Sequence, residues 1–60
     1  MNTNLPKDPY MLLSFINTQL RDKFVTLEAC CEYYDIEAGE LKKTLAALDY
    51  EYDEGLNRFV

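Results

Sequence analysis

Two adjacent cysteines and eleven carboxylates are the side chains of this 60-residue chain best suited to chemistry, and the chain contains no histidine. A relaxed disulfide needs Cα atoms farther apart than one peptide step, so Cys30 and Cys31 are not expected to bond to each other. Two thiols without histidine also fall short of the four ligands that structural zinc requires. We therefore expect both cysteines to be small core residues, with a redox role as the alternative.

The carboxylates predict a solvated surface rather than a site with a paired acid and base or a calcium ion. Gly39 and Gly55 are the only glycines, so no glycine-rich loop is available to hold a phosphate. We predict no catalytic residue, no metal ligand, no cofactor and no small-molecule substrate. The chain is not expected to be an enzyme.

The formal net charge of −5 disfavours nucleic acid as a partner, because phosphate backbones repel an acidic chain at long range. A local basic surface can still overcome this repulsion, and Lys42, Lys43 and Arg58 are the residues that would contact phosphates. The start "MNTNLPKDPY" does not resemble a signal peptide, and no apolar run approaches the length of a membrane span. A cytoplasmic location without a membrane partner is expected.

A hydrophobic fraction of 48% predicts a folded chain. After an N-terminal tail at 1–7, we expect a first helix at 8–24 in which Asp8 caps the start and Pro9 occupies the first helical position. A second helix is predicted at 26–35 and a third at 37–48. The core-facing residues of the three helices are expected to include Leu12, Leu13, Ile16, Leu20, Phe24, Leu27, Cys30, Cys31, Tyr34, Leu41, Leu45 and Leu48.

From Asp49 onward the apolar period changes from helical to two residues, which predicts a hairpin at 50–60. The whole chain is therefore expected to be one small, mainly α domain: a three-helix, helix-turn-helix-like bundle with a short C-terminal β-hairpin, or mini winged helix. Departures from a DNA-binding version are acidic residues at the turn and at the start of the third helix, where Glu37 and Glu40 would face phosphates.

Two features of the first helix stand out as candidate contact sites. Met11 and Phe15 form an apolar patch away from the core-facing side, which either another element covers or a partner binds. Asn17 lies at the edge of the core-facing side, where its amide is expected to bond a loop or the hairpin, with a ligand or partner contact as the alternative. Arg21 and Asp22 are expected to be ion-pairing residues that fix the turn into Lys23 and Phe24.

The stretches "NLPKDPYMLLSFINTQLRD" and "YEYDEGLNRFV" resemble the small bacterial proteins of domain-of-unknown-function family 4250. The resemblance covers nearly the whole chain and implies a single small domain without an assigned activity.

The favoured function is a non-catalytic protein-protein interaction or adaptor module, whose partner is another protein or a second copy of the chain in a homodimer. A nucleic-acid-binding, transcription-regulator-like domain is the alternative.

Overall fold

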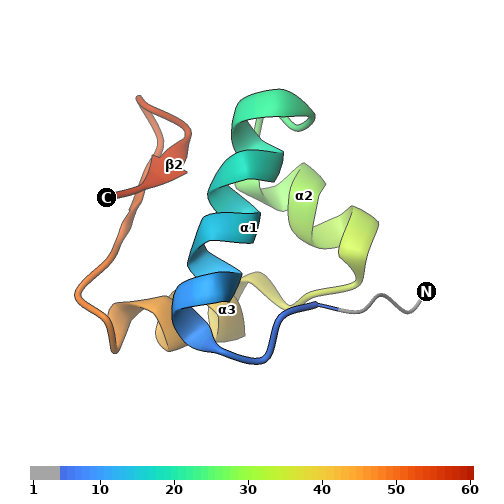
Figure 1. The fold of residues 1–60 in the computed structure, drawn as a ribbon. Coiled ribbons are helices and arrows are strands. Elements are labelled where there is room, and N and C mark those ends of the chain that lie inside the picture. Colours follow the sequence, from blue (N-terminus) through green and yellow to red (C-terminus); the bar gives the residue numbers. More distant parts are fainter. Residues whose placement is uncertain (1–4) are drawn as a thin grey trace.

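The computed structural model describes residues 5–60, which form three helices followed by a short antiparallel hairpin (Figure 1). This order confirms the predicted fold class. Residues 1–4 of the predicted N-terminal tail lie outside the described residues. The elements are α1 (Pro9–Asp22), α2 (Leu27–Tyr34), α3 (Ala38–Ala46), β1 (Tyr52–Asp53) and β2 (Arg58–Phe59).

Each helix begins at a side-chain cap that the local sequence supplies. Asp8 Oδ2 accepts the amide of Met11 at 3.0 Å, and Pro9 follows as the first residue of α1. Thr26 Oγ1 accepts the amide of Ala29 at 3.1 Å at the start of α2. These contacts satisfy backbone N–H groups that have no partner within the first turn of a helix.

The ends of α2 and α3 depend on aspartates with left-handed backbone. Asp35 has φ 58° and ends α2, at a position where glycine is usual, and α3 starts three residues later behind the cap Glu37. Asp49 has φ 68°, and the amide of Tyr50 bonds the carbonyl of Leu45 at 3.1 Å, so the chain turns away after α3. The third helix therefore ends two residues before the predicted position 48.

The hairpin pairs Tyr52 with Phe59 and Asp53 with Arg58. Glu51 and Val60 extend the ladder, because each amide bonds the other residue's carbonyl, at 3.0 and 2.8 Å. In this alternation the Tyr52–Phe59 pair is the one without hydrogen bonds between the strands, so the N–H and C=O of Phe59 point away from β1.

Helix α1 stands between α2 and β2, and α3 crosses the base of the molecule (Figure 1). The hairpin thus lies along α1 and is not a free wing beside α3. One continuous core joins all three helices to the second strand, and its buried residues are Leu13, Ile16, Leu20, Leu27, Cys30, Cys31, Leu41, Leu45 and Phe59. Most of the predicted core residues belong to this set, while Leu12, Phe24, Tyr34 and Leu48 are half-buried around it.

Within residues 5–60, no helix has both the length and the apolar character needed to cross a membrane.

Candidate functional site

Asn17 joins α1 to the outer edge of the hairpin. Its Nδ2 donates to the carbonyl of Phe59 at 3.1 Å, and its Oδ1 accepts the amide of Phe59 at 2.8 Å. The side-chain amide therefore satisfies both backbone groups that point away from β1, as a neighbouring strand would. This is the structural tie to the hairpin that the sequence indicated for Asn17.

Asn57 makes the reverse connection, from the hairpin to the end of α1. Its Nδ2 donates to the carbonyls of Leu20, at 3.1 Å, and Phe24, at 3.0 Å. The hydroxyl of Tyr52 donates to Asn57 Oδ1, and burial raises the pKa of Tyr52, which favours the protonated form that donates. Asn57 has φ 53°, a left-handed conformation that asparagine tolerates better than most residues. Its amide supplies partners that the C-terminal end of a helix otherwise lacks.

The two asparagines flank an open groove between α1 and the hairpin, which we call the α1–hairpin groove. Residues of α1 between Leu13 and Asp22 form one wall, residues 23–25 close one end, and Tyr50 with residues 56–58 form the other wall. The groove has a volume of about 860 Å³. Its walls come from segments that are far apart in the sequence.

The α1–hairpin groove combines apolar and polar groups. Val25 and Leu56, at the end nearest the hairpin turn, are 85% and 60% exposed. The α1 wall offers the side chains of Ser14, Thr18 and Arg21, all exposed. The surface can therefore bury apolar side chains and donate hydrogen bonds at the same time.

Arg21 and Asp22, both predicted to be ion-pairing residues, form an ion pair with each other, with 2.8 Å between Nε and Oδ1. The hydrogen bond from Arg21 lowers the pKa of the Asp22 carboxyl, and both side chains are largely exposed. The pair is bidentate, because Arg21 Nη2 also donates to Asp22 Oδ2 at 3.1 Å. Solvent screens such an exposed pair, so an anionic partner can compete with Asp22 for Arg21.

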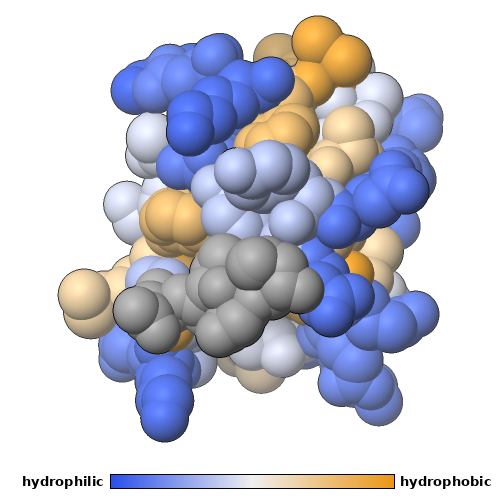
Figure 2. All heavy atoms as spheres, turned by 90° about the vertical axis from the view of Figure 1, so that its right-hand side faces the viewer, coloured by the Kyte–Doolittle hydropathy of each residue, from blue (hydrophilic) through white to orange (hydrophobic). Residues whose placement is uncertain are grey.

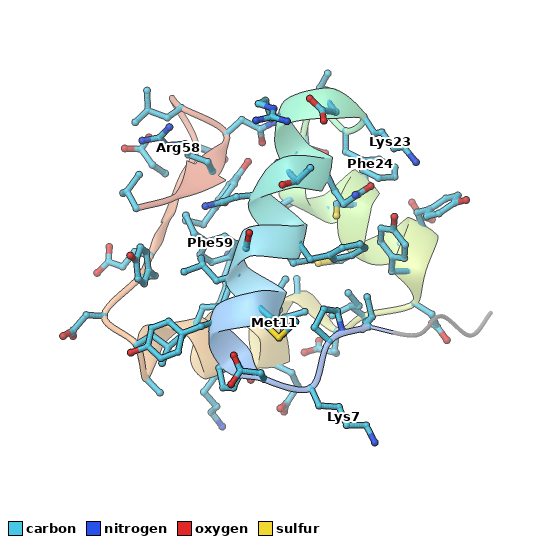
Figure 3. All side chains as sticks on the ribbon, viewed as in Figure 1. Lys7, Met11, Lys23, Phe24, Arg58 and Phe59 are labelled. Atoms are coloured by element: carbon cyan, nitrogen blue, oxygen red, sulfur yellow. The ribbon has the colours of Figure 1, made fainter. Side chains whose placement is uncertain are left out.

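The predicted patch of Met11 and Phe15 is not one continuous surface. Phe15 is half-buried, and its ring lies 5.4 Å from that of Tyr34 in an edge-to-face arrangement. Tyr34 is itself held to α1, because its hydroxyl donates to Gln19 Oε1 at 2.9 Å. Helix α2 thus covers Phe15, whereas Met11 remains 62% exposed at the lower end of α1 (Figure 3).

The candidate phosphate-binding residues Lys42, Lys43 and Arg58 are all exposed, but Arg58 lies apart from Lys42. Successive strand residues point to opposite faces, and Phe59 lines a smaller hollow together with Lys42. Arg58 lines the α1–hairpin groove instead, at its upper end (Figure 3). The structure therefore associates Arg58 with Arg21.

Lys23 closes the end of the same groove, but its side chain points toward the α2 side of the molecule (Figure 3). On that face, hydrophilic side chains lie at the upper left and along much of the right-hand side, and apolar side chains are exposed in separate areas, one of them at the top (Figure 2).

Cys30 and Cys31 are buried and free, in the core as predicted. Burial is the main cause that raises the pKa of both thiols, to about 11 for Cys30. A raised pKa disfavours the reactive thiolate. Among the described residues, no group of three or more His, Cys, Asp and Glu side chains is placed to hold a metal ion.

Sequence reasoning missed Asn57 and the exposed pair Val25 and Leu56. An asparagine two residues after an Asp-Glu-Gly turn is ordinary hairpin composition, and nothing local indicates that its amide bonds carbonyls 33 and 37 residues away. Val25 lies in a short connection, where an apolar residue has no periodic pattern to mark it.

Comparison with known families gives one match. The family model described as "Domain of unknown function (DUF4250)" matches residues 6–59. No curated protein and no solved structure matches the chain. The match extends over α1, α2, α3 and both strands, and so includes every residue that forms the α1–hairpin groove. The chain therefore belongs to the DUF4250 family.

Proposed function

We propose that this domain is a non-catalytic protein-interaction module that binds its partner in the α1–hairpin groove. The observation that carries the proposal is the groove itself, in which Val25 and Leu56 remain largely exposed beside the hydrogen-bonding side chains of α1. Interface cores combine apolar contact with a small number of well-placed polar groups. The proposal moves the partner surface away from Met11 and Phe15, since Phe15 packs against Tyr34.

The groove is preformed, which favours binding. Asn17 and Asn57 fix the hairpin to α1 through four hydrogen bonds to backbone groups. A partner therefore meets two walls that are already ordered, and the free energy cost of ordering loops on binding is small.

Two other partners stand as alternatives to this proposal. Nucleic acid is disfavoured by the net charge and by Glu37 and Glu40 at the start of α3, although Arg21 and Arg58 could contact phosphates. A second copy of the chain is the other alternative, because a 60-residue domain has a small core and gains stability from further burial.

Site-specific photocrosslinking in cells tests the proposal. A benzoylphenylalanine at Thr18, which is exposed in the groove, should crosslink to a discrete protein, whereas the same residue at Thr44, exposed on α3, should not. The crosslinked protein is then identified and purified, and its affinity is measured by isothermal titration calorimetry. We expect Leu56→Asp to weaken binding at least tenfold.

Equal crosslinking from Thr18 and Thr44, no crosslink from Thr18, or an affinity that Leu56→Asp leaves unchanged would contradict the proposal. A crosslink from Thr18 to a second copy would instead establish self-association. A Thr18 crosslink to nucleic acid would support the alternative function.

A further inference from the structure

We infer that the occupant of the α1–hairpin groove is an acidic protein segment that also carries an apolar side chain. This inference rests on the proposed function and adds the chemistry of the partner. It follows from the distribution of charge along the groove and from the hydrogen bonds that already occupy the outer edge of β2 at Phe59.

Positive charge is concentrated at the groove in a chain that is otherwise strongly acidic. Arg21 on α1 and Arg58 on the hairpin line opposite walls, so a segment lying between them meets a guanidinium on each side. Asp22, which bonds Arg21, is the one carboxylate among the residues that line the groove, although the chain contains eleven acidic residues. Asp53 is paired with Arg58 in the hairpin, and its Oδ1 accepts the amide of Leu56 at 3.1 Å, but Asp53 does not line the groove.

The uncharged polar groups of the same wall favour the same partner. Ser14 and Thr18 point from α1 into the groove and can donate their hydroxyl protons. Guanidinium groups bind carboxylates through paired N–H donors, and hydroxyls add further donors to carboxylate or carbonyl oxygens. An acidic segment therefore matches this wall better than a basic or a neutral one.

The apolar end of the groove favours an apolar side chain on the partner. Val25 and Leu56 come from the α1–α2 connection and the hairpin turn, which lie at the same end of the molecule (Figure 1). An apolar side chain on the partner would remove both from water, and this contact provides affinity that charge alone does not. The arginines then fix the orientation of the segment and increase its association rate.

The segment is bound through its side chains and not as an added strand. Strand addition needs free N–H and C=O groups at a sheet edge. At Phe59, the outward-pointing N–H and C=O of β2 already bond Asn17. This edge is therefore closed at the position where a partner strand would pair.

Selection from a displayed library of random 12-residue peptides tests the inference with the full chain. Peptides enriched on the wild-type protein should be net acidic and contain at least one large apolar residue. A synthetic copy of the most enriched peptide should shift the amide resonances of residues 17–25 and 56–58 in a ¹⁵N–¹H spectrum, and leave those of 40–46 unchanged.

Two double variants that change the net charge equally distinguish the effect of charge in the groove from the effect of the net charge of the whole chain. Arg21→Glu with Arg58→Glu should weaken the peptide at least tenfold at physiological salt, and Lys42→Glu with Lys43→Glu, exposed on α3, should change affinity less than threefold. Circular dichroism confirms that both variants remain folded. A third variant, Leu56→Asp, should also weaken binding of the peptide at least tenfold.

Each contrary result has a distinct meaning. Neutral or basic peptides that map to the groove overturn this inference and leave the proposed function standing. Peptides that map elsewhere, or no enrichment at all, count against both. Tighter binding of a single-stranded or duplex oligonucleotide to the same residues, or equal losses in the two double variants, also overturns the inference.

Discussion

Replacing Asn17 with alanine should destabilise the protein by about 2–3 kcal/mol. The substitution removes the two hydrogen bonds between its side chain and Phe59, each worth about 0.5–1.5 kcal/mol net. It also leaves the N–H and C=O of Phe59 without these partners next to a buried ring, and such a loss costs roughly 1–3 kcal/mol. We expect the total loss to stay near the lower end of the sum of these contributions, because Asn17 is half-buried and water can reach part of the gap.

A loss of this size is large for a chain of 60 residues. Typical stabilities of about 0.05–0.15 kcal/mol per residue give a total of roughly 3–9 kcal/mol. At about 4–8 °C per kcal/mol, the midpoint of thermal unfolding should fall by roughly 10–20 °C. Urea unfolding followed by circular dichroism measures the free energy, and hydrogen exchange at the amide of Phe59 reports the local effect.

Two variants serve as controls for Asn17→Ala. Thr18→Ala changes the next, exposed residue and should alter stability by less than about 0.5 kcal/mol. Asn17→Asp keeps an acceptor for the Phe59 amide but replaces the donor by an oxygen that faces the Phe59 carbonyl, so it should be no more stable than Asn17→Ala. The reasoning fails if Asn17→Ala is as stable as Thr18→Ala and the Phe59 amide exchanges at the wild-type rate.

Three further predictions concern residues in the core or packed against it. Phe15→Ala should cost about 2 kcal/mol in urea unfolding because Phe15 packs against the core, whereas Met11→Ala should cost less than about 0.5 kcal/mol; equal losses would contradict the assignment. A thiol reagent should label Cys30 and Cys31 about a hundredfold or more slowly in the native protein than in denaturant, and rapid native labelling of either would favour a redox role. Under reducing conditions, stability should fall between pH 9 and 11, because the Cys30 thiol ionises above its ordinary pKa of 9.0 when unfolded and only at about 11 when folded. The stabilising contribution is complete below pH 9, is lost as the pH rises through about 11, and should be absent from the pH profile of Cys30→Ala.

Features that depend on neighbouring residues could be predicted from the sequence. Asp8 with Pro9, and Thr26, set the starts of two helices through contacts three residues apart. The apolar period of the helices identified the core-facing sides, because one face of a helix repeats every three to four residues. The end of α3 was placed too late, since Asp49 is not a glycine and its left-handed backbone is fixed by the turn around it.

Features that depend on distant residues could be predicted only in part. A polar residue beside the core of α1 indicated that Asn17 must find a partner, but not that the partner was the backbone of Phe59. The helical pattern placed Met11 and Phe15 together, because it contains no information about the position of Tyr34. Arg58 was grouped with the lysines of α3 by charge alone, whereas the alternation of β2 turns it to the opposite face from Phe59.

The reciprocal contacts of Asn17 and Asn57 explain how so small a domain keeps a rigid groove. Phe59 is the only fully buried side chain that the described hairpin contributes to the core, and the same residue's backbone is held by Asn17. Moving the hairpin away from α1 would therefore expose the Phe59 ring and break hydrogen bonds at both asparagines together. Because these losses occur in one step, the two walls of the α1–hairpin groove open only when the core itself opens. A variant such as Asn17→Ala should accordingly weaken peptide binding in the groove as well as stability, while Met11→Ala should affect neither.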